Sequence, residues 1–249
     1  MKKYDLILIG ATFLSVGIAK AYKGKCLIIE PKAKPGYEFI DSFSVGENYD
    51  KELLTDEGRA FKNYFESEEL CDNPFTPEWT AFLSNYICKN NIDILLFTNV
   101  LKVEQNDNSN KLTIFNSLGK GEILADRVID TRTNSIAYKT LNAVVYGEEF
   151  YEFCDGIKEI YRKDLVRIVE FKMPASYDYP EARNAVYSIW KGRPEELNDT
   201  RLAAVADIFF EKSDVENKNI SLGYDEIYST YHANPFLAFD KGILFGGAL

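Results

Sequence analysis

The sequence has few of the residues that metal and disulfide sites require. Its 249 residues include a single histidine, His232, and four cysteines, at positions 26, 71, 88 and 154. No two of the cysteines have the short spacing of zinc ligands or of a redox pair, which argues against a zinc site and a disulfide reductase. Scattered thiols suit free, buried cysteines in a reducing compartment, so we expect a cytoplasmic protein.

Long basic runs and long apolar runs are also lacking. Lysine and arginine number 29 against 39 aspartates and glutamates, which gives a net charge of −10, and no basic run exceeds two residues. This charge repels phosphate backbones, so we expect no nucleic-acid partner. Asp5, Lys20 and Lys23 interrupt the apolar N-terminal segment before it reaches the roughly twenty residues of a membrane span, so we expect no membrane partner.

The residues that are present suit a folded globular protein. Hydrophobic residues make up 46% of the chain and aromatic residues 14%, which argues against disorder as the main state. The length suits one large domain or two small ones.

The first thirty residues predict a βαβ unit. Residues 4–9 form a short, apolar, β-branched run typical of a central parallel strand. Residues 12–23 have the apolar spacing of a packed helix that Gly24 ends, and residues 25–29 form a second buried strand that ends at Glu30-Pro31.

The next hundred residues continue with mixed elements. We expect a charged surface helix over 55–70 and a second helix that Thr76 caps and Pro77 begins. Its apolar face comprises Trp79, Phe82, Leu83, Tyr86 and Ile87. A buried strand over 92–97, a hairpin of 100–104 with 111–116, and a strand over 123–130 follow.

After residue 140 the pattern becomes that of an antiparallel sheet with one helix. Residues 143–146, 165–173 and 185–190 are predicted strands, and residues 195–211 a helix with one apolar side. The final segment, 242–249, is apolar and is predicted to be a strand.

The first βαβ unit predicts a dinucleotide site. Gly10 supplies the tight turn after the first strand, and Glu30 lies twenty residues later, where an acid accepts hydrogen bonds from ribose hydroxyls. The helix N-terminus between them favours a phosphate. Thr12 and Ser15 stand where glycines are usual, so a βαβ unit that binds no nucleotide remains the alternative.

Three segments carry a resemblance to a known family. The stretches YDLILIGATFLSVGIAKAYKGKCLIIEPKAKPGYEF, FLSNYICKNNIDILLFTNVLKVE and GEILADRVIDTRTN together span about residues 4–134. They resemble the FAD-dependent oxidoreductases of the glutathione-reductase-like fold. The resemblance implies an α/β fold: a Rossmann-like FAD/NAD(P)-binding domain (1–140 with 236–249) and a smaller antiparallel domain (141–235).

The resemblance also implies where FAD binds. Glu30 would hold the adenosine ribose with Pro31 beside it, and the backbone of Val103, or of its neighbour Leu101, would face the adenine. Thr131 and Arg132 would occupy the turn after the second fingerprint. The pyrophosphate would be surrounded by Gly10, Thr12, Phe13, Leu14 and Ser15.

Catalytic side chains are harder to identify from the sequence. His232 is a candidate acid or base, although a buried structural imidazole is the commoner role for such a residue. Arg167 and Arg183 are candidates for binding a substrate carboxylate, with surface charges as the alternative. Aromatic residues that could stack on a substrate, or simply form a core, are Tyr177, Tyr179, Tyr187 and Trp190.

The leading hypothesis is a FAD-dependent oxidoreductase that transfers hydride between a small organic substrate and the flavin. The alternative is a degenerate member without catalytic activity, a nucleotide-binding or structural module, because Thr12, Ser15 and Arg132 depart from the usual motifs. A third option is an enzyme that uses NAD alone through Glu30. The sequence predicts no metal and leaves the oligomeric state open, with a homo-oligomer as one option.

Overall fold

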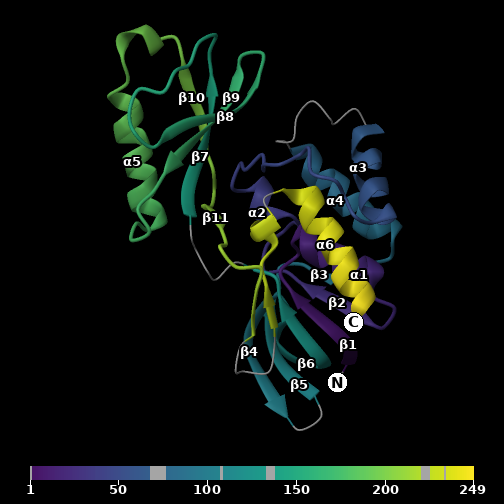
Figure 1. Cartoon of the computed structure of the whole chain (residues 1–249). Helices are drawn as coiled ribbons and strands as arrows, with labels where there is room; N and C mark the ends of the chain where they lie inside the picture. The colour runs from purple at the N-terminus through teal and green to yellow at the C-terminus, as the bar shows by residue number, and fades with distance from the viewer. Residues whose placement is uncertain (1, 68–76, 107–108, 133–137, 220–224, 233) are drawn as a thin grey trace.

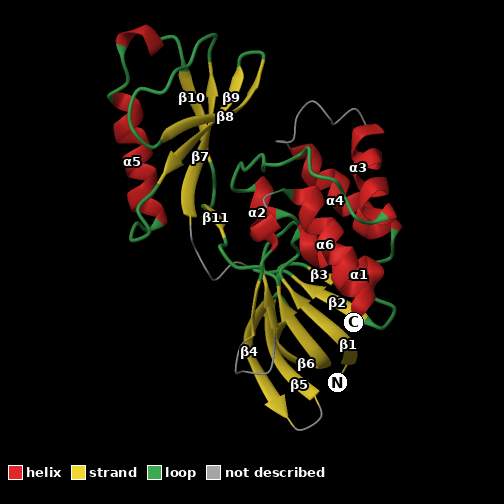
Figure 2. Ribbon diagram, in the orientation of Figure 1, coloured by secondary structure: helices red, strands yellow, loops and turns green. Residues whose placement is uncertain are grey.

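A computed structural model describes residues 2–67, 77–106, 109–132, 138–219, 225–232 and 234–249. In this part of the chain an eight-stranded sheet carries most of the helices, and a five-stranded antiparallel sheet with one long helix stands beside it (Figure 1). Figure 2 shows the same two bodies by secondary structure. The predicted α/β class with a Rossmann-like domain and a second antiparallel sheet is confirmed.

The core of the larger sheet is parallel. The sheet has the strand order β12 (Asn217–Asn219), β13 (Asp225–Ile227), β6 (Gly119–Asp130), β1 (Lys2–Ile9), β2 (Cys26–Ile29) and β3 (Ile94–Leu95). Along this order β12 pairs antiparallel with β13, and the other pairings are parallel. β1 pairs in parallel with both β2 and β6. This confirms the predicted strands at 4–9, 25–29 and 123–130.

The two faces of this sheet are buried by different elements. Leu6 and Leu8 of β1 point into a core shared with the helices, whereas Ile7 and Ile9 point to the opposite face. The helices on the first face are α1 (Phe13–Ala21), α3 (Asp56–Ser67), α4 (Pro77–Lys89) and α6 (Pro235–Ala248). The second face is covered by β4 (Asn99–Asn106), β5 (Ser109–Asn116) and the first half of β6. The second half of β1, Leu6–Ile9, is buried on both sides, which explains why these four residues are all apolar.

Two predictions in this half need correction. Residues 55–70 were expected to form a surface helix, but Phe61 and Phe65 of α3 are buried, and Phe61 stacks on Phe239 of α6 at a centroid distance of 4.0 Å. The charged residues lie only on its outer side. The strand expected over 92–97 is reduced to Ile94 and Leu95, which are half-buried because β3 is the edge strand.

The final segment is a helix and not the predicted strand. Asn234 caps α6 by accepting a hydrogen bond from the Leu237 N–H, and Pro235 occupies its first turn. Gly242 and Gly246 face α1 so closely that an added Cβ would lie 2.2 Å from the Leu14 carbonyl or 2.4 Å from that of Ile18. The glycines are therefore the contact surface of a helix pair.

The second sheet has the order β10 (Arg201–Val205), β7 (Tyr138–Tyr146), β9 (Val166–Lys172) and β8 (Ile157–Lys163). β11 (Phe210–Lys212) also pairs with β7. All these pairings are antiparallel, which confirms the predicted strands at 143–146 and 165–173.

The helix of this body lies where a strand was predicted. Residues 185–190 belong to α5 (Tyr179–Lys191), which begins at a capping box of Asp178 and Glu181. Ala182, Val186 and Trp190 are spaced four apart and pack on the sheet. The apolar content of residues 185–190 by itself favours a strand, whereas the capping box before them begins a helix.

The helix predicted over 195–211 is also wrong. The segment contains a single 3-10 turn, Glu195–Leu197, followed by β10 and β11. Both strands pair with β7, which is more than fifty residues away in the sequence. Long-range pairing of this kind overrides the helical spacing of the local sequence.

The division into two domains remains a prediction. One strand of the predicted second domain, β13, pairs with β6 in the parallel sheet. Among the described helices none is long and apolar enough to cross a bilayer.

Candidate functional site

The carboxyl ends of three parallel strands bring the predicted site residues together. Ile9 is paired with Ile29 on one side and with Asp130 on the other. The residues that follow each strand, Gly10, Glu30 and Thr131, therefore meet at one edge of the sheet. This edge, at the point where neighbouring crossovers diverge, is where open α/β sheets bind ligands.

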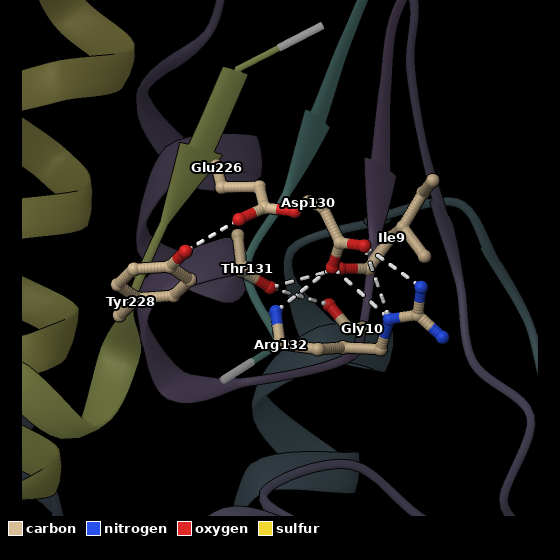
Figure 3. A network of polar contacts seen from close by, with 7 residues as sticks. All are labelled: Ile9, Gly10, Asp130, Thr131, Arg132, Glu226 and Tyr228. Atoms are coloured by element: carbon tan, nitrogen blue, oxygen red, sulfur yellow. Dashed lines mark hydrogen bonds and ion pairs between the residues drawn. The ribbon is translucent and has the colours of Figure 1, made fainter. Parts of the chain in front are cut away.

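The turn after β1 requires glycine at position 10. Gly10 has φ of +95°, a conformation that residues with a Cβ rarely adopt. An added Cβ would lie 2.7 Å from Cγ of Arg132, so the Arg132 side chain lies directly on the turn. The Thr131 hydroxyl lies 3.1 Å from the carbonyl oxygens of both Ile9 and Gly10, which fixes the end of β6 against the turn (Figure 3).

Arg132 is held in place by an acid from its own strand. Its guanidinium forms charge-assisted hydrogen bonds with Asp130, from Nε to Oδ1 at 3.0 Å and to Oδ2 at 3.3 Å, and from Nη2 to Oδ2 at 2.7 Å. Beside this pair Tyr228 donates a hydrogen bond to Glu226, the residue that faces Asp130 in β13 (Figure 3). The charge of Arg132 is thus largely neutralised within the protein.

Glu30 is buried beneath the turn. It has no exposed surface, and both carboxylate oxygens accept backbone hydrogen bonds, from Ala11 N at 2.7 Å and from Lys32 N at 2.8 Å. Burial raises its pKa, and these two hydrogen bonds oppose the rise. Glu30 therefore ties the two crossover turns together in this arrangement, and its predicted contact with a ribose remains a prediction.

The N-terminus of α1 is occupied by side chains of the protein. Thr12 is the N-cap, and its hydroxyl accepts a hydrogen bond from Ser15 N at 3.1 Å. The N–H of Phe13 donates to Oε1 of Glu38 at 2.8 Å, and the hydroxyl of Ser229 donates to the same oxygen at 3.0 Å.

Glu38 was not among the predicted site residues. It lies in α2 (Tyr37–Ile40), a single helical turn that Gly36 anchors by donating its N–H to the Ala11 carbonyl at 2.7 Å. The side chain is 6% exposed, and burial raises its pKa to about 7. Within the described part of the chain its second oxygen, Oε2, has no hydrogen-bond partner. The only signal in the sequence was an acid eight residues after Glu30, within KPGYEF.

A cavity of about 330 Å³ opens beside these residues. One side is formed by the parallel sheet and its crossovers, the other by the second body. Its lining comprises Thr12, Lys32, Tyr37, Glu38, Thr131, Arg132, Tyr179, Asp207, Ile208, Phe209, Glu211 and Thr230. Polar groups of both signs line it, with Tyr179 and Phe209 as its aromatic surfaces.

Other predicted residues lie away from the cavity. Val103 is in β4, opposite Leu112, and packs on the far face of the sheet, while Leu101 is exposed. Leu14 is in the core of α1, and Pro31 follows Glu30 in the crossover. None of these four is among the residues that line the cavity.

The candidate catalytic histidine is buried. His232 ends the 3-10 turn Ser229–His232, and burial lowers its pKa to about 4. Its Nε2 lies 3.8 Å from Glu216, an exposed residue whose charge water screens. Its neighbour Thr230 lines the cavity, whereas His232 does not.

The remaining candidates have structural partners. Arg167 is buried and pairs with Glu159 at 3.0 Å, and Arg183 is exposed and contacts Tyr187. Tyr177 and Trp190 pack on the core of the second sheet. Of the four predicted aromatic residues, Tyr179 alone lines the cavity. No group of three metal-ligating side chains occurs in the part of the chain that the structure describes.

Comparison with known proteins finds likeness in structure alone. Neither a protein-family model nor a curated protein sequence matches the chain. Glycine oxidase from Geobacillus kaustophilus is 11% identical with a TM-score of 0.60, over 99% of this chain and 93% of that chain. A geranylgeranyl bacteriochlorophyll reductase-like protein from Thermoplasma acidophilum is 10% identical with a TM-score of 0.62, over 99% and 77% of the two chains.

A flavoprotein/dehydrogenase from Cytophaga hutchinsonii is also similar, at 14% identity and a TM-score of 0.54, over 98% of this chain and 77% of that chain. Another similar structure is that of CmlS, a flavin-dependent halogenase, at 14% identity and a TM-score of 0.57, over 100% of this chain and 56% of that chain. The chain shares its fold with these proteins. At these identities the likeness concerns the fold, and the chemistry has to be argued from the site.

The site as arranged here does not fit the pyrophosphate of FAD. The first N–H of α1 is bound to a carboxylate, the ribose acid is fully covered, and Arg132 lies on the glycine turn. A second negative group brought to Phe13 would face the charge of Glu38 at close range. A dinucleotide therefore requires Glu38 to leave the end of the helix.

Proposed function

We propose that this protein is a flavin-linked oxidoreductase whose cofactor, FAD, binds at the carboxyl edge of the parallel sheet. The observation that carries the proposal is the convergence of Gly10, Glu30 and Thr131 at the carboxyl edge of the parallel sheet. This edge borders a cavity between the two bodies, which Thr131 lines together with Thr12 and Arg132. The flavoprotein fold of the neighbours supports it. When bound, FAD would supply hydride chemistry toward a small organic substrate, and the protein would supply binding and orientation.

The proposal includes the narrower likeness to the glutathione-reductase-like group and the binding residues that this likeness implies. Glu30 would approach the adenosine ribose, and the turn at Gly10 with the N-terminus of α1 would approach the phosphates. In this proposal Tyr179 and Phe209 of the second body would present aromatic surface to the substrate side of the cavity.

A second candidate function is favoured by Glu38. If its carboxylate holds the N-terminus of α1 permanently, the protein keeps the flavoprotein fold without the cofactor and acts as a binding or structural module. The two functions differ in what the purified protein binds.

The test is the visible absorption spectrum of the freshly purified protein, followed by titration with FAD. A flavin spectrum, or quenching of FAD fluorescence that saturates at one equivalent, is the expected result. Binding also raises the melting temperature, since a hundredfold excess of ligand over Kd stabilises the fold by about 2.7 kcal/mol. A colourless protein that neither quenches FAD nor gains stability contradicts the oxidoreductase and supports the module.

NADH titration is the matched control for the nucleotide. Binding of NADH together with no response to FAD would favour an enzyme that uses NAD alone through Glu30.

A further inference from the structure

We propose that the Glu38 carboxylate occupies the place at the N-terminus of α1 where a ligand's phosphate would bind, which we call the phosphate seat. A dinucleotide binds at this seat only by displacing Glu38. The inference rests on the proposed site for FAD and concerns one residue that determines access to it.

The seat is defined by the helix and its turn. α1 is nine residues long, and its first turn follows the Gly10 turn at the carboxyl edge of the sheet. Backbone N–H groups and the helix dipole together favour an anion at such an end. The Phe13 N–H already has an anion, the Glu38 carboxylate, at 2.8 Å.

Glu38 is positioned by residues outside α2. Ser229, at the return from β13, donates to Oε1 of Glu38, and Gly36, with φ of +76°, turns the chain so that α2 lies against Ala11. Three segments that are far apart in the sequence therefore hold one carboxyl group at the end of α1.

The second oxygen of Glu38 shows that the group is not built for stability alone. Oε2 is buried and has no hydrogen-bond partner among the described residues, and Glu38 lines the cavity. An unpaired buried oxygen costs free energy that a structural carboxylate would normally recover through a hydrogen bond. Glu38 itself is among the residues that border the cavity, next to Thr12 at the start of α1.

Charge makes occupancy by Glu38 and by a pyrophosphate mutually exclusive. Glu30 lies close enough to Glu38 to raise its pKa, so the seat already holds two acids. Lys32 is engaged with Asp41 at 3.2 Å, and Arg132 with Asp130, so neither nearby cation is free of a partner acid. Removing the Glu38 carboxylate would leave an N–H donor and a site of lower negative charge.

The experiment measures equilibrium binding of ADP and of FAD at pH 8 to four proteins: the unaltered chain, Glu38→Ala, Glu38→Gln and Glu122→Gln. Glu38→Ala empties the seat. Glu38→Gln removes only the charge and keeps an acceptor for Phe13 and Ser229. It therefore controls for a change in binding that results from misfolding of Glu38→Ala. Glu122→Gln, on the exposed hairpin far from the cavity, makes the same change in net charge.

We expect Glu38→Ala to bind ADP at least tenfold more tightly than the unaltered chain. Glu38→Gln should show a smaller gain and Glu122→Gln none. The Phe13 amide resonance should shift on adding ADP to Glu38→Ala, which a change at a distant site would not cause.

The outcomes separate this inference from the proposed function. Equal FAD affinity in all four proteins supports the cofactor and overturns the role of Glu38, as does weaker binding by Glu38→Ala. Tighter ADP binding by Glu38→Ala without FAD binding supports the role of Glu38 and overturns the cofactor. Failure of all four proteins to bind either ligand overturns both.

Discussion

At the scale of single residues, the protein buries two titratable groups that make its stability depend on pH in opposite directions. Burial raises the pKa of Glu38 to about 7 and lowers that of His232 to about 4. In both cases the fold disfavours the charged form, because the low-dielectric interior replaces water. Ser229 links the two groups, because its hydroxyl donates to Glu38 and it begins the turn that His232 ends.

The first prediction concerns Glu38 and pH. The folded protein holds the Glu38 proton up to pH 7, and the unfolded chain releases it near pH 4.5, so the folded state binds more protons between these values. The stability due to Glu38 is therefore fully present below pH 4.5 and is lost as pH rises through 7, by up to about 3 kcal/mol. Urea unfolding of Glu38→Gln across this range should lack that loss.

His232 predicts the reverse slope. Its unfolded pKa is near 6.5 and its folded pKa about 4, so the unfolded chain binds the extra proton. Stability due to His232 is present above pH 6.5 and is lost as pH falls through 4, again by up to about 3 kcal/mol. His232→Gln should remove this loss in the same urea measurements. An unchanged pH profile in both variants would contradict the burial of these groups.

At the scale of elements, the contact between α1 and α6 holds the N-terminal βαβ unit to the C-terminal helix. Gly17 in α1 and Gly242 and Gly246 in α6 allow the two backbones to approach without intervening side chains. Such close packing leaves no room for a methyl group, because the nearest neighbours are backbone atoms and not flexible side chains.

Gly242→Ala should therefore destabilise the protein by about 1–3 kcal/mol or more, since its Cβ would lie 2.2 Å from the Leu14 carbonyl. Gly247→Ala is the matched control in the same helix, because an added Cβ there meets nothing within 4 Å. The control should be neutral or slightly stabilising, as alanine favours a helix by up to about 1 kcal/mol over glycine. Chemical denaturation of the two variants checks the prediction, and equal midpoints would refute the close contact.

At the scale of the whole molecule, hydrogen bonds connect the second sheet to the segment after α2. Asn142 of β7 is buried, and its Nδ2 donates to the Ser42 carbonyl at 2.9 Å. Its own carbonyl accepts from Ala206, and the next residue, Asp207, donates its N–H to Asp41 at 3.1 Å. The segment that carries Glu38 is thus tied to the body that closes the cavity.

Asn142→Ala should loosen this connection at a cost of about 1–3 kcal/mol, because it leaves buried backbone carbonyls without their donor. We expect hydrogen exchange to increase in peptides that cover residues 138–146 and 201–212, while peptides of β1 and α1 keep their protection. Asn116→Ala, which breaks hydrogen bonds on the hairpin side, serves as the control. Uniform loss of protection across the chain would show that the two bodies unfold as one.

Parts of the fold and site could be predicted from local sequence and parts could not. The strands before Gly10 and Glu30 were predicted because strands buried on both faces are continuously apolar. The segments 185–190 and 242–249 were mistaken for strands, because apolar residues and glycines do not distinguish a strand from a closely packed helix. Glu38 was missed since its role depends on Ser229, 191 residues away.

The sequence by itself determined the βαβ unit, the glycine at the turn and the acid at the end of β2, since each follows from conformational limits on neighbouring residues. The tertiary structure alone decided the partners of those groups. It placed Arg132 on the turn, buried Glu30 under two backbone N–H groups and set Glu38 at the end of α1. Such contacts join segments that only folding brings together, so no local pattern encodes them.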